Sequence, residues 1–240
     1  MSNLPEEWTT SKRVLLILAH PDDPEFFCGA TIARWVKEGN EVSCVLLTRG
    51  ERGGRNNSLD TENLGHIREK EQRAAAEVLG FKTIEFLDLE DGFLEVNLET
   101  RRMVARIIRE KTPDILVTGD PTNYFPLKTR INHPDHRAAG QIVMDALYPA
   151  AGSRLFFPEL IEEGLKPHSP QELWLTLTSE PNVIIDVTDY WEVKIDALLK
   201  HKSQVGAPDE FIERMRARRT EDSTEEEPRF VEAFRRFRLP

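Results

Sequence analysis

The stretch LILAHPDDPEFFCGATIARWVKEG, residues 16–39, joins a strongly apolar run to an amphipathic one. Residues 14–19 are almost entirely apolar, which is typical of a strand covered on both faces of a parallel sheet. Residues 24–37 carry apolar side chains near helical spacing, and Gly39 offers a C-cap. The stretch therefore predicts a buried strand that passes within a few residues into a helix.

The alternation of strand and helix continues downstream. Further strands are predicted over residues 41–48, 83–87, 114–118, 172–177 and 183–187. Further helices are predicted over residues 66–79, 98–110, 134–147 and 191–204. The polar stretches 49–64 and 119–132 are predicted to be loops. Strands that alternate with helices predict an α/β fold with a doubly wound, mostly parallel sheet and helices on both faces.

The composition is that of an ordinary globular protein. Of the 240 residues, 39% are hydrophobic and 31% charged, which allows a sizeable core. Because no repeat or linker stands out, we predict a single domain over residues 1–240. Its core is expected at about residues 13–204 and a helical C-terminal tail at 205–240. The tail holds a basic block, residues 214–219, and an acidic block, residues 221–227, which we interpret as solvated faces that offset each other.

Charge and cysteine content exclude some partners and compartments. The net charge of −10 argues against nonspecific binding to nucleic acid or to anionic lipid. Because Cys28 and Cys44 are the two cysteines, we expect no disulfide framework and a reducing, cytoplasmic location. The N-terminus MSNLPEEWTTSKR lacks the apolar segment of a signal peptide, and no stretch reaches the length of a membrane span.

Two clusters of metal-binding residue types follow predicted strands. They are His20, Asp22 and Asp23 after the first strand, and His133, Asp135 and His136 after the fourth. In open α/β sheets, ligands bind beyond the carboxyl ends of the strands. The two clusters are therefore predicted to meet at one site, although they lie more than a hundred positions apart in the chain.

The residue types suit a catalytic metal. Zinc takes imidazole nitrogen and carboxylate oxygen, and a catalytic site commonly keeps three protein ligands. His133 and His136 share a face of a helical turn, whereas Asp22 and Asp23 point in different directions, so one can be a ligand and the other can stand beside a water. The alternative is that each motif merely begins a helix, where Asp and Pro are favoured. Two carboxylates beside an imidazole would be costly to bury without a cation, which favours the metal site.

At these motifs the sequence resembles the PIG-L/LmbE-type zinc-dependent de-N-acetylases. The resemblance rests on AHPDDPEF and HPDHRAAG, supported by LTRGERGG, IREKEQRAAAEVLG and the pair Asp91–Gly92. It covers about residues 13–204. It implies a Rossmann-like fold and a hydrolase that removes an N-acetyl or other N-acyl group from amino-sugar conjugates, such as N-acetylglucosamine-containing glycolipid precursors or precursors of bacterial low-molecular-weight thiols.

The resemblance also implies a catalytic site. His20, Asp23 and His136 would ligate one zinc ion per chain, although iron or cobalt suits the same ligands. Asp22 would be the general base that takes a proton from the attacking water. His133 would stabilise the oxyanion or protonate the leaving amine.

Two more residues receive roles from the resemblance. Asp135 would orient His133 as in a carboxylate–imidazole pair. Arg68 would hold a hydroxyl, carboxylate or phosphate of the substrate. The alternative for Arg68 is a surface arginine paired with Glu71 on the same helix.

The first motif departs from the HPDDE pattern that is usual in the family, because Pro24 intervenes. Glu25 is therefore interpreted as a first-turn helix residue, which the helix dipole favours, rather than a catalytic one. The roles of His66, His168 and His201 stay open. The first lies near the glycine-rich loop, and the other two lie in the less regular C-terminal third, where packing and a place at the pocket edge are both compatible with the sequence.

Two other functions stay open. A metal-dependent phosphoesterase would need two metal ions and more carboxylates. A non-catalytic module would use the pocket to sense a small amine or sugar, although a free base at Asp22 favours catalysis. In each case the partner is a small molecule. Relatives are often homo-oligomers. Because no interface can be read from this sequence, the oligomeric state stays open.

Overall fold

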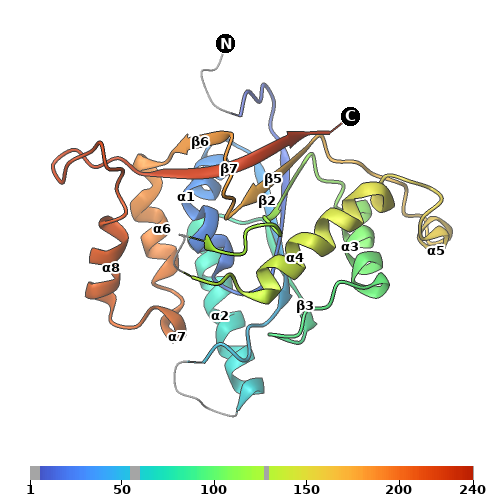
Figure 1. Ribbon diagram of the computed structural model, residues 1–240, viewed down its shortest axis with the longest axis horizontal. Coiled ribbons are helices and arrows are strands. Elements are labelled where there is room, and N and C mark those ends of the chain that lie inside the picture. The colour runs from blue at the N-terminus through green and yellow to red at the C-terminus, as the bar shows by residue number, and fades with distance from the viewer. Residues whose placement is uncertain (1–5, 55–59, 127–129, 240) are drawn as a thin grey trace.

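The computed structural model describes residues 6–54, 60–126 and 130–239. Within these ranges the strands form a seven-stranded sheet in the order β3-β2-β1-β4-β5-β7-β6 (Figure 1). The strands are β1 (Arg13–Leu18), β2 (Glu41–Thr48), β3 (Thr83–Leu89), β4 (Ile115–Gly119), β5 (Glu172–Thr176), β6 (Val183–Asp186) and β7 (Val231–Arg238). All pairings from β3 to β5 are parallel, and β7 runs antiparallel to β5 and β6. The predicted doubly wound, mostly parallel sheet is confirmed.

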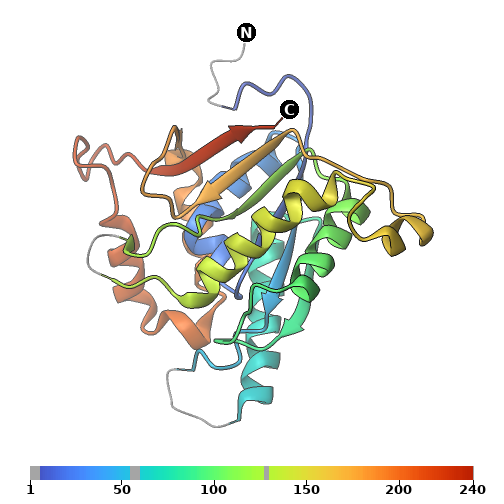
Figure 2. The same ribbon diagram turned by 45° about the vertical axis from the view of Figure 1, so that its right-hand side comes forward.

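Helices cover both faces of the sheet (Figure 2). One face is covered by α1 (Asp23–Lys37), α2 (Thr61–Leu79), α6 (Trp191–Leu198) and α8 (Pro208–Arg216). The other is covered by α3 (Leu98–Lys111), α4 (Pro134–Asp145) and η2 (Ala146–Ala151). Shorter elements are α5 (Pro158–Glu162), η3 (Thr188–Tyr190) and α7 (Lys202–Val205).

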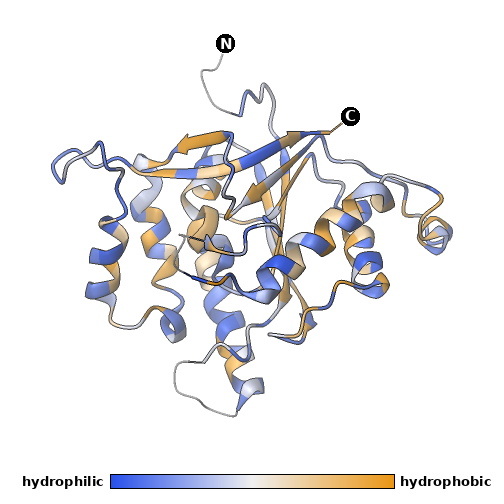
Figure 3. Ribbon diagram, in the orientation of Figure 1, coloured by the Kyte–Doolittle hydropathy of each residue, from blue (hydrophilic) through white to orange (hydrophobic). Residues whose placement is uncertain are grey.

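Strand β1 shows why the opening stretch reads as apolar throughout. Leu16 and Leu18 pack into the core on one face, whereas Leu15 and Ile17 pack into the core on the other. All four side chains are at most 2% exposed. A strand covered on both faces has no solvent side on which polar residues could alternate. Figure 3 shows the same pattern as hydrophobic colour along the central strands.

Three helix boundaries differ from the sequence expectation. Helix α2 begins earlier, at Thr61, because the Asp60 side chain caps it by accepting from the Asn63 N–H at 3.0 Å. The end of the predicted loop 49–64 is therefore helical, and residues 55–59 lie outside the described part of the chain. Helix α4 ends at Asp145. In a continued helix the ring of Pro149 would clash with the backbone carbonyl of Asp145, four residues earlier.

The expected helix over residues 191–204 is divided into α6 and α7, with His201 as the residue before α7. The predicted loop 119–132 does lead from β4 to α4, and residues 127–129 of it lie outside the described ranges.

The expectation of a helical tail over residues 205–240 is wrong beyond α8. Residues Val231–Arg238 form β7, which fills the space between β5 and β6. The buried side chain of Phe234 joins the core, as do Phe211 and Met215 from α8, so the core extends past residue 204. This strand forms by pairing with β5 and β6. The local sequence pattern does not reveal a pairing with strands that are distant in the chain.

The sheet order reverses direction at β1, which pairs with β2 on one side and with β4 on the other. Such a switch point is where open α/β sheets bind ligands, at the carboxyl ends of the strands. The residues that follow β1 and β4 are the two histidine–aspartate motifs. Within the described residues, no helix has the length and apolar character needed to cross a membrane.

Candidate active site

The first motif occupies the turn from β1 into α1. Asp22 has a left-handed backbone conformation, with φ 84°, which turns the chain sharply. The Asp23 N–H donates to the carbonyl of His20 at 3.3 Å, and the Asp22 N–H donates to Oε1 of Gln72 at 2.8 Å. The two successive carboxylates consequently point to different partners, Asp23 to histidines and Asp22 to Arg68.

The second motif begins α4. His133 is the N-cap residue, and the Asp135 N–H donates to its Nδ1 at 3.2 Å. Gly140 lets α4 lie against the end of β4, because a Cβ there would come within 2.3 Å of the Gly119 carbonyl oxygen. This close approach brings His136 to the edge of the sheet where β1 ends.

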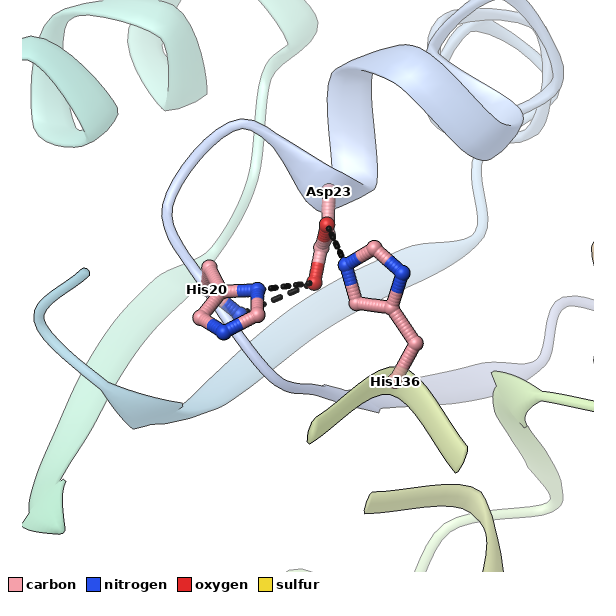
Figure 4. Close-up of side chains that lie close together, drawn as sticks. All are labelled: His20, Asp23 and His136. Carbon is pink, nitrogen blue, oxygen red and sulfur yellow. Dashed lines mark hydrogen bonds and ion pairs between the residues drawn. The ribbon is translucent and has the colours of Figure 1, made fainter. Parts of the chain in front are cut away.

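The two motifs meet at Asp23 (Figure 4). Its Oδ1 lies 3.0 Å from Nε2 of His136, and its Oδ2 lies 3.6 Å from Nδ1 of His20. One donor atom from each of these three residues falls within 4.8 Å of the other two. Two imidazole nitrogens and a carboxylate at such spacing can surround one divalent ion.

The outer nitrogens of both imidazoles have acceptors of their own. Nε2 of His20 lies 3.1 Å from Oδ1 of Asp91 and 3.2 Å from Oδ2 of Asp135. Nδ1 of His136 lies 3.1 Å from Oδ1 of Asn132. Carbonyl and carboxylate oxygens accept from these outer nitrogens, so the inner nitrogens, on the side of Asp23, would be the ligand atoms for a metal ion. The donor set therefore fits a bound metal ion.

Sequence reasoning missed Asp91 and Asn132 as parts of this site. The Asp91–Gly92 pair enters the sequence analysis only as a match to the family. Asn132, the residue before His133, belongs to no motif that would indicate a role in the site. Asp91 follows β3, where the backbone N–H of Arg52 donates to its Oδ2 at 2.9 Å. The His20 imidazole lowers the pKa of Asp91 to about 2, against the opposing effect of burial. Asp91 is therefore an ionised acceptor for His20.

Asp23 and His20 stabilise each other's charged forms. Burial alone would raise the pKa of Asp23, but the charges and hydrogen bonds of His136 and His20 lower it well below its usual range. Burial would also lower the pKa of His20, but hydrogen bonds to Asp135, Asp23 and Asp91 raise it well above its usual range. An excess of buried carboxylate around two imidazoles is an environment that favours a cation.

Asp22 stands in a different environment from its neighbour. Burial raises its pKa to about 6, with Asp23 adding to the rise and the cation of Arg68 opposing it. Its Oδ2 lies 3.2 Å from Nη2 of Arg68, and its side chain is 15% exposed. Asp22 therefore lies beside the metal-binding residues with a carboxylate suited to accept a proton near neutral pH.

Arg68 is buried, so its interpretation as a surface arginine paired with Glu71 is wrong. Its Nη1 donates to the carbonyl of Gly50 at 2.7 Å and its Nη2 to the carbonyl of Pro21 at 2.6 Å. Glu71 instead accepts from Ser203. Arg68 thus ties the glycine-rich loop and the Asp22 turn together while lining the same cavity as the metal-binding residues.

The expected pairing of the Asp135 carboxylate with the His133 ring is not what the structure has. Oδ2 of Asp135 accepts from the Gly92 N–H at 2.7 Å and contacts His20, while its Oδ1 faces the Leu94 N–H at 3.3 Å. Only the backbone of Asp135 bonds to the His133 ring. The carboxylate turns inward because the loop after β3 offers it two N–H groups, which the sequence could not place.

A fully buried network lies behind Asp22. Gln72, which accepts from the Asp22 N–H, donates to Oε1 of Glu25 at 2.8 Å. Oε2 of Glu25 lies 3.2 Å from Nε2 of His201. Glu25 is in the first turn of α1, as expected. Its contact with His201 also links α1 to the C-terminal part of the chain. His201 has a packing role in this network rather than a place at the cavity surface.

The other two histidines lie apart from the site. His66 is exposed within α2, whose N-cap residue is Asp60. Nε2 of His168 lies 2.6 Å from the carbonyl of Pro113, on the chain before β4. Neither lines the cavity of about 300 Å³ at the metal-binding residues, whose walls include Phe26, Phe27 and Arg68.

Comparisons with known proteins agree with this site. Residues 15–147 match the family model of the PIG-L GlcNAc-PI de-N-acetylases. The diacetylchitobiose deacetylase of Thermococcus kodakarensis is 35% identical over 83% of this chain and 72% of its own. A probable N-acetyl-alpha-D-glucosaminyl L-malate deacetylase 2 of Bacillus anthracis is 28% identical over 80% of this chain and 81% of its own.

Solved structures show the same relationship. The N,N'-diacetylchitobiose deacetylase of Pyrococcus horikoshii, solved with an inhibitor, superposes with a TM-score of 0.86 and 30% identity, over 98% of this chain and 87% of its own. The 4-carboxy-2-hydroxymuconate hydratase GalB, with a TM-score of 0.73 over 95% of this chain and 97% of its own, is only 21% identical and shares the fold alone.

The family is metal-dependent, and the two histidine–aspartate motifs of this chain supply a candidate metal site that includes His20, Asp23 and His136. The matched relatives are deacetylases of N-acetylated amino sugars, which supports an enzyme that acts on N-acetyl groups. From the matched family model, the similarity over most of the chain and the shared fold, it follows that this chain belongs to the PIG-L family of de-N-acetylases.

Proposed function

We propose that the protein is a zinc-dependent de-N-acetylase that removes the N-acetyl group from an amino-sugar conjugate. The observation that carries the proposal is the meeting of His20, Asp23 and His136 around a common point, with Asp22 beside them in the same cavity. A bound zinc ion would polarise the amide carbonyl and make a water more acidic.

Asp22 takes a proton from the attacking water in this proposal. Its raised pKa, about 6, leaves it ionised at neutral pH yet basic enough to accept that proton. The backbone hydrogen bond to Gln72 and the contact with Arg68 fix its position. The same carboxyl group can then return the proton toward the leaving amine.

His133 stabilises the oxyanion of the tetrahedral intermediate. Burial lowers its pKa, and the nearby charges of His20 and His136 lower it further, which favours the neutral ring. Because its Nδ1 accepts from the Asp135 N–H, its Nε2 carries the proton and can donate a hydrogen bond into the cavity that it lines. Asp135 acts here through its backbone and through His20, rather than through a carboxylate bond to His133.

The two alternatives gain less support. A phosphoesterase would need two ions about 3.5–4 Å apart. The two candidate ligand groups of the described residues share His20, whose Nε2 already faces two carboxylates. A sensor module would not need a base such as Asp22, and the matched relatives are named as deacetylases.

Metal analysis followed by a substrate panel tests the proposal. We expect one zinc ion per chain, and release of free amine from N-acetylglucosamine glycosides or N,N'-diacetylchitobiose. His136→Ala should lose both the metal and the activity. Two ions per chain would favour the phosphoesterase, and tight ligand binding without amine release would favour the sensor.

We also infer a reducing, cytoplasmic location for the protein. The support is that Cys28 and Cys44 are both buried and free. Burial raises the pKa of both thiols well above the usual range, so they behave as small apolar core residues. A homo-oligomer stays a proposal to be tested by the mass of the protein in solution.

A further inference from the structure

A second cavity, of about 500 Å³, adjoins the metal site. The two cavities share the side chains of Phe26, Phe27, His133 and His136, so a ligand can extend from one into the other. The second cavity lies between the segment before α4 and the segment after α8, two parts of the chain that no sequence motif connects. It is therefore placed to receive the part of a substrate beyond the N-acetyl sugar.

Two arginines line this cavity, Arg130 before α4 and Arg218 after α8. Within the described residues, no carboxylate lines it with them. Burial lowers the pKa of the Arg218 guanidinium, and the charges of Arg214 and Arg130 lower it further. Three cations therefore lie near one another in a protein of net charge −10, and among the described residues no carboxylate forms an ion pair with any of them.

The neighbouring arginines of the same basic block behave differently. Nη2 of Arg216 lies 2.7 Å from Oε2 of Glu192, and Nη2 of Arg219 lies 3.3 Å from Oε1 of Glu225. Arg214 lies over the ring of Phe211 at 5.1 Å. The block interpreted as a solvated face is thus divided, because Arg216 and Arg219 pair with acids whereas Arg218, although exposed, lines the cavity.

The remaining walls are apolar or uncharged. Phe26, Phe27, Pro126, Ile131 and Leu177 provide apolar surface, and Asn123, Asn132 and Thr178 are polar and uncharged. Such walls suit an organic group with a carbon skeleton, and the guanidiniums suit a planar or tetrahedral anion carried by that group.

We propose that this arginine-lined cavity binds an anionic group, a carboxylate or a phosphate, on the aglycone of the amino-sugar substrate. The inference rests on the proposed deacetylase function and narrows its substrate class. Arg130 and Arg218 hold the anion, while the shared aromatic walls guide the conjugate so that its acetamido group enters the metal site.

Paired substrates that differ in charge test the inference. The carboxymethyl glycoside of N-acetylglucosamine is compared with its neutral carbamoylmethyl counterpart, and N-acetylglucosamine 1-phosphate with the neutral methyl glycoside. We expect the anionic member of at least one pair to have a kcat/KM higher by about tenfold, as expected for a charged hydrogen bond. The pair with the larger ratio tells a carboxylate from a phosphate.

The variant Arg130→Gln/Arg218→Gln should lose this preference, so that kcat/KM becomes equal within each pair of substrates. The matched control is Arg154→Gln, which removes a charge from an exposed position between η2 and α5. The control should keep the wild-type preference. Equal kcat/KM within both pairs, or a preference that survives in the double variant, would overturn the inference.

A binding measurement separates this inference from the proposed function. Calorimetry on zinc-loaded Asp22→Asn protein compares the same pairs without requiring turnover. Tighter binding of an anionic glycoside that the arginine substitutions abolish supports the cavity assignment, even if no glycoside is hydrolysed and the proposed function fails. Equal binding of the anionic and neutral members overturns the assignment, even if both are hydrolysed.

Discussion

At the scale of single residues, Asp22 and Asp23 show how the surroundings of a carboxyl group set its pKa. They are identical, adjacent and both near the sheet edge, yet their pKa values shift in opposite directions. Asp23 contacts two imidazoles, which stabilise its anion, whereas Asp22 is desolvated beside a like charge. Carboxyl groups whose pKa values are driven apart in this way are suited to the separate tasks of ligand and base that we propose for them.

Replacing Asp22 by Asn separates these two tasks. We expect Asp22→Asn to keep the metal, because His20, Asp23 and His136 are unchanged, and to lower kcat by roughly two orders of magnitude or more, because the general base is lost. Metal content and initial rates on an N-acetyl sugar are measured together. Asp196→Asn, at an exposed position on α6, is the matched control and should be fully active. A fully active Asp22→Asn enzyme would remove Asp22 from the mechanism.

The pKa of Asp22 also predicts a pH dependence. The base works only when ionised, and its pKa is raised to about 6, so kcat/KM should fall as the pH drops below about 6 and level off above it. Metal content is checked at each pH, because protonation of the ligands would also lower activity. The idea fails if the metal is retained and the rate shows no change across this range.

At the scale of elements, β7 and α6 are joined by a buried ion pair. Nζ of Lys194 lies 2.6 Å from Oε1 of Glu232, and both residues are at most 5% exposed. Glu232 also accepts from the N–H of Thr31 at 2.8 Å, and Lys194 donates to the carbonyl of Phe26 at 2.9 Å. This pair ties α1, on which the candidate metal ligand Asp23 lies, to the C-terminal third of the chain.

Breaking this pair from one side should destabilise the fold. Lys194→Met leaves the Glu232 carboxylate buried without its cation, and we expect the free energy of unfolding to fall by about 3–5 kcal/mol. Lys194→Met/Glu232→Gln should recover much of the loss, because the remaining group is neutral. Urea unfolding measures both. Arg216→Met, which breaks an exposed pair with Glu192 near the same helix, is the control and should cost at most about 1 kcal/mol. Similar losses for both single variants would contradict the buried pair's importance.

At the scale of the whole molecule, the doubly wound sheet brings the ends of β1 and β4 together at the point where its order reverses. A fold of this kind hosts unrelated chemistry, as the shared architecture with a hydratase illustrates. The chemistry therefore depends on which side chains stand at that edge. In this chain they are two histidines and an aspartate on segments far apart in sequence.

A metal ion held by both segments should stabilise the whole fold. Binding to the folded chain alone contributes about 2.7 kcal/mol when free metal is a hundred times its dissociation constant. We expect Tm to rise on adding zinc to chelator-treated protein and to fall again on chelation. His136→Ala should abolish most of this shift. An unchanged Tm in the wild-type protein would count against a site that joins β1–α1 to α4.

Local pattern was sufficient for much of this structure. The continuous apolar run of β1 and the helical spacing of α1 predict their elements because each reports the burial of its own segment. The two motifs predicted the residues that meet at the metal site, since both follow parallel strands. The tail prediction was wrong because residues 231–238 form a strand only through pairing with β5 and β6.

The sequence by itself determined the order of the strands and the main helices up to about residue 204, and it predicted that the two histidine–aspartate motifs would meet at one edge of a parallel sheet. Only the tertiary structure decided that Asp91 and Asn132 contact the imidazoles, that the Asp135 carboxylate turns to His20, and that Arg218 lines a cavity next to the candidate metal site. The physical reason is that periodicity records whether a residue is buried, whereas hydrogen-bond and charge partners depend on which distant segments the packed sheet brings into contact.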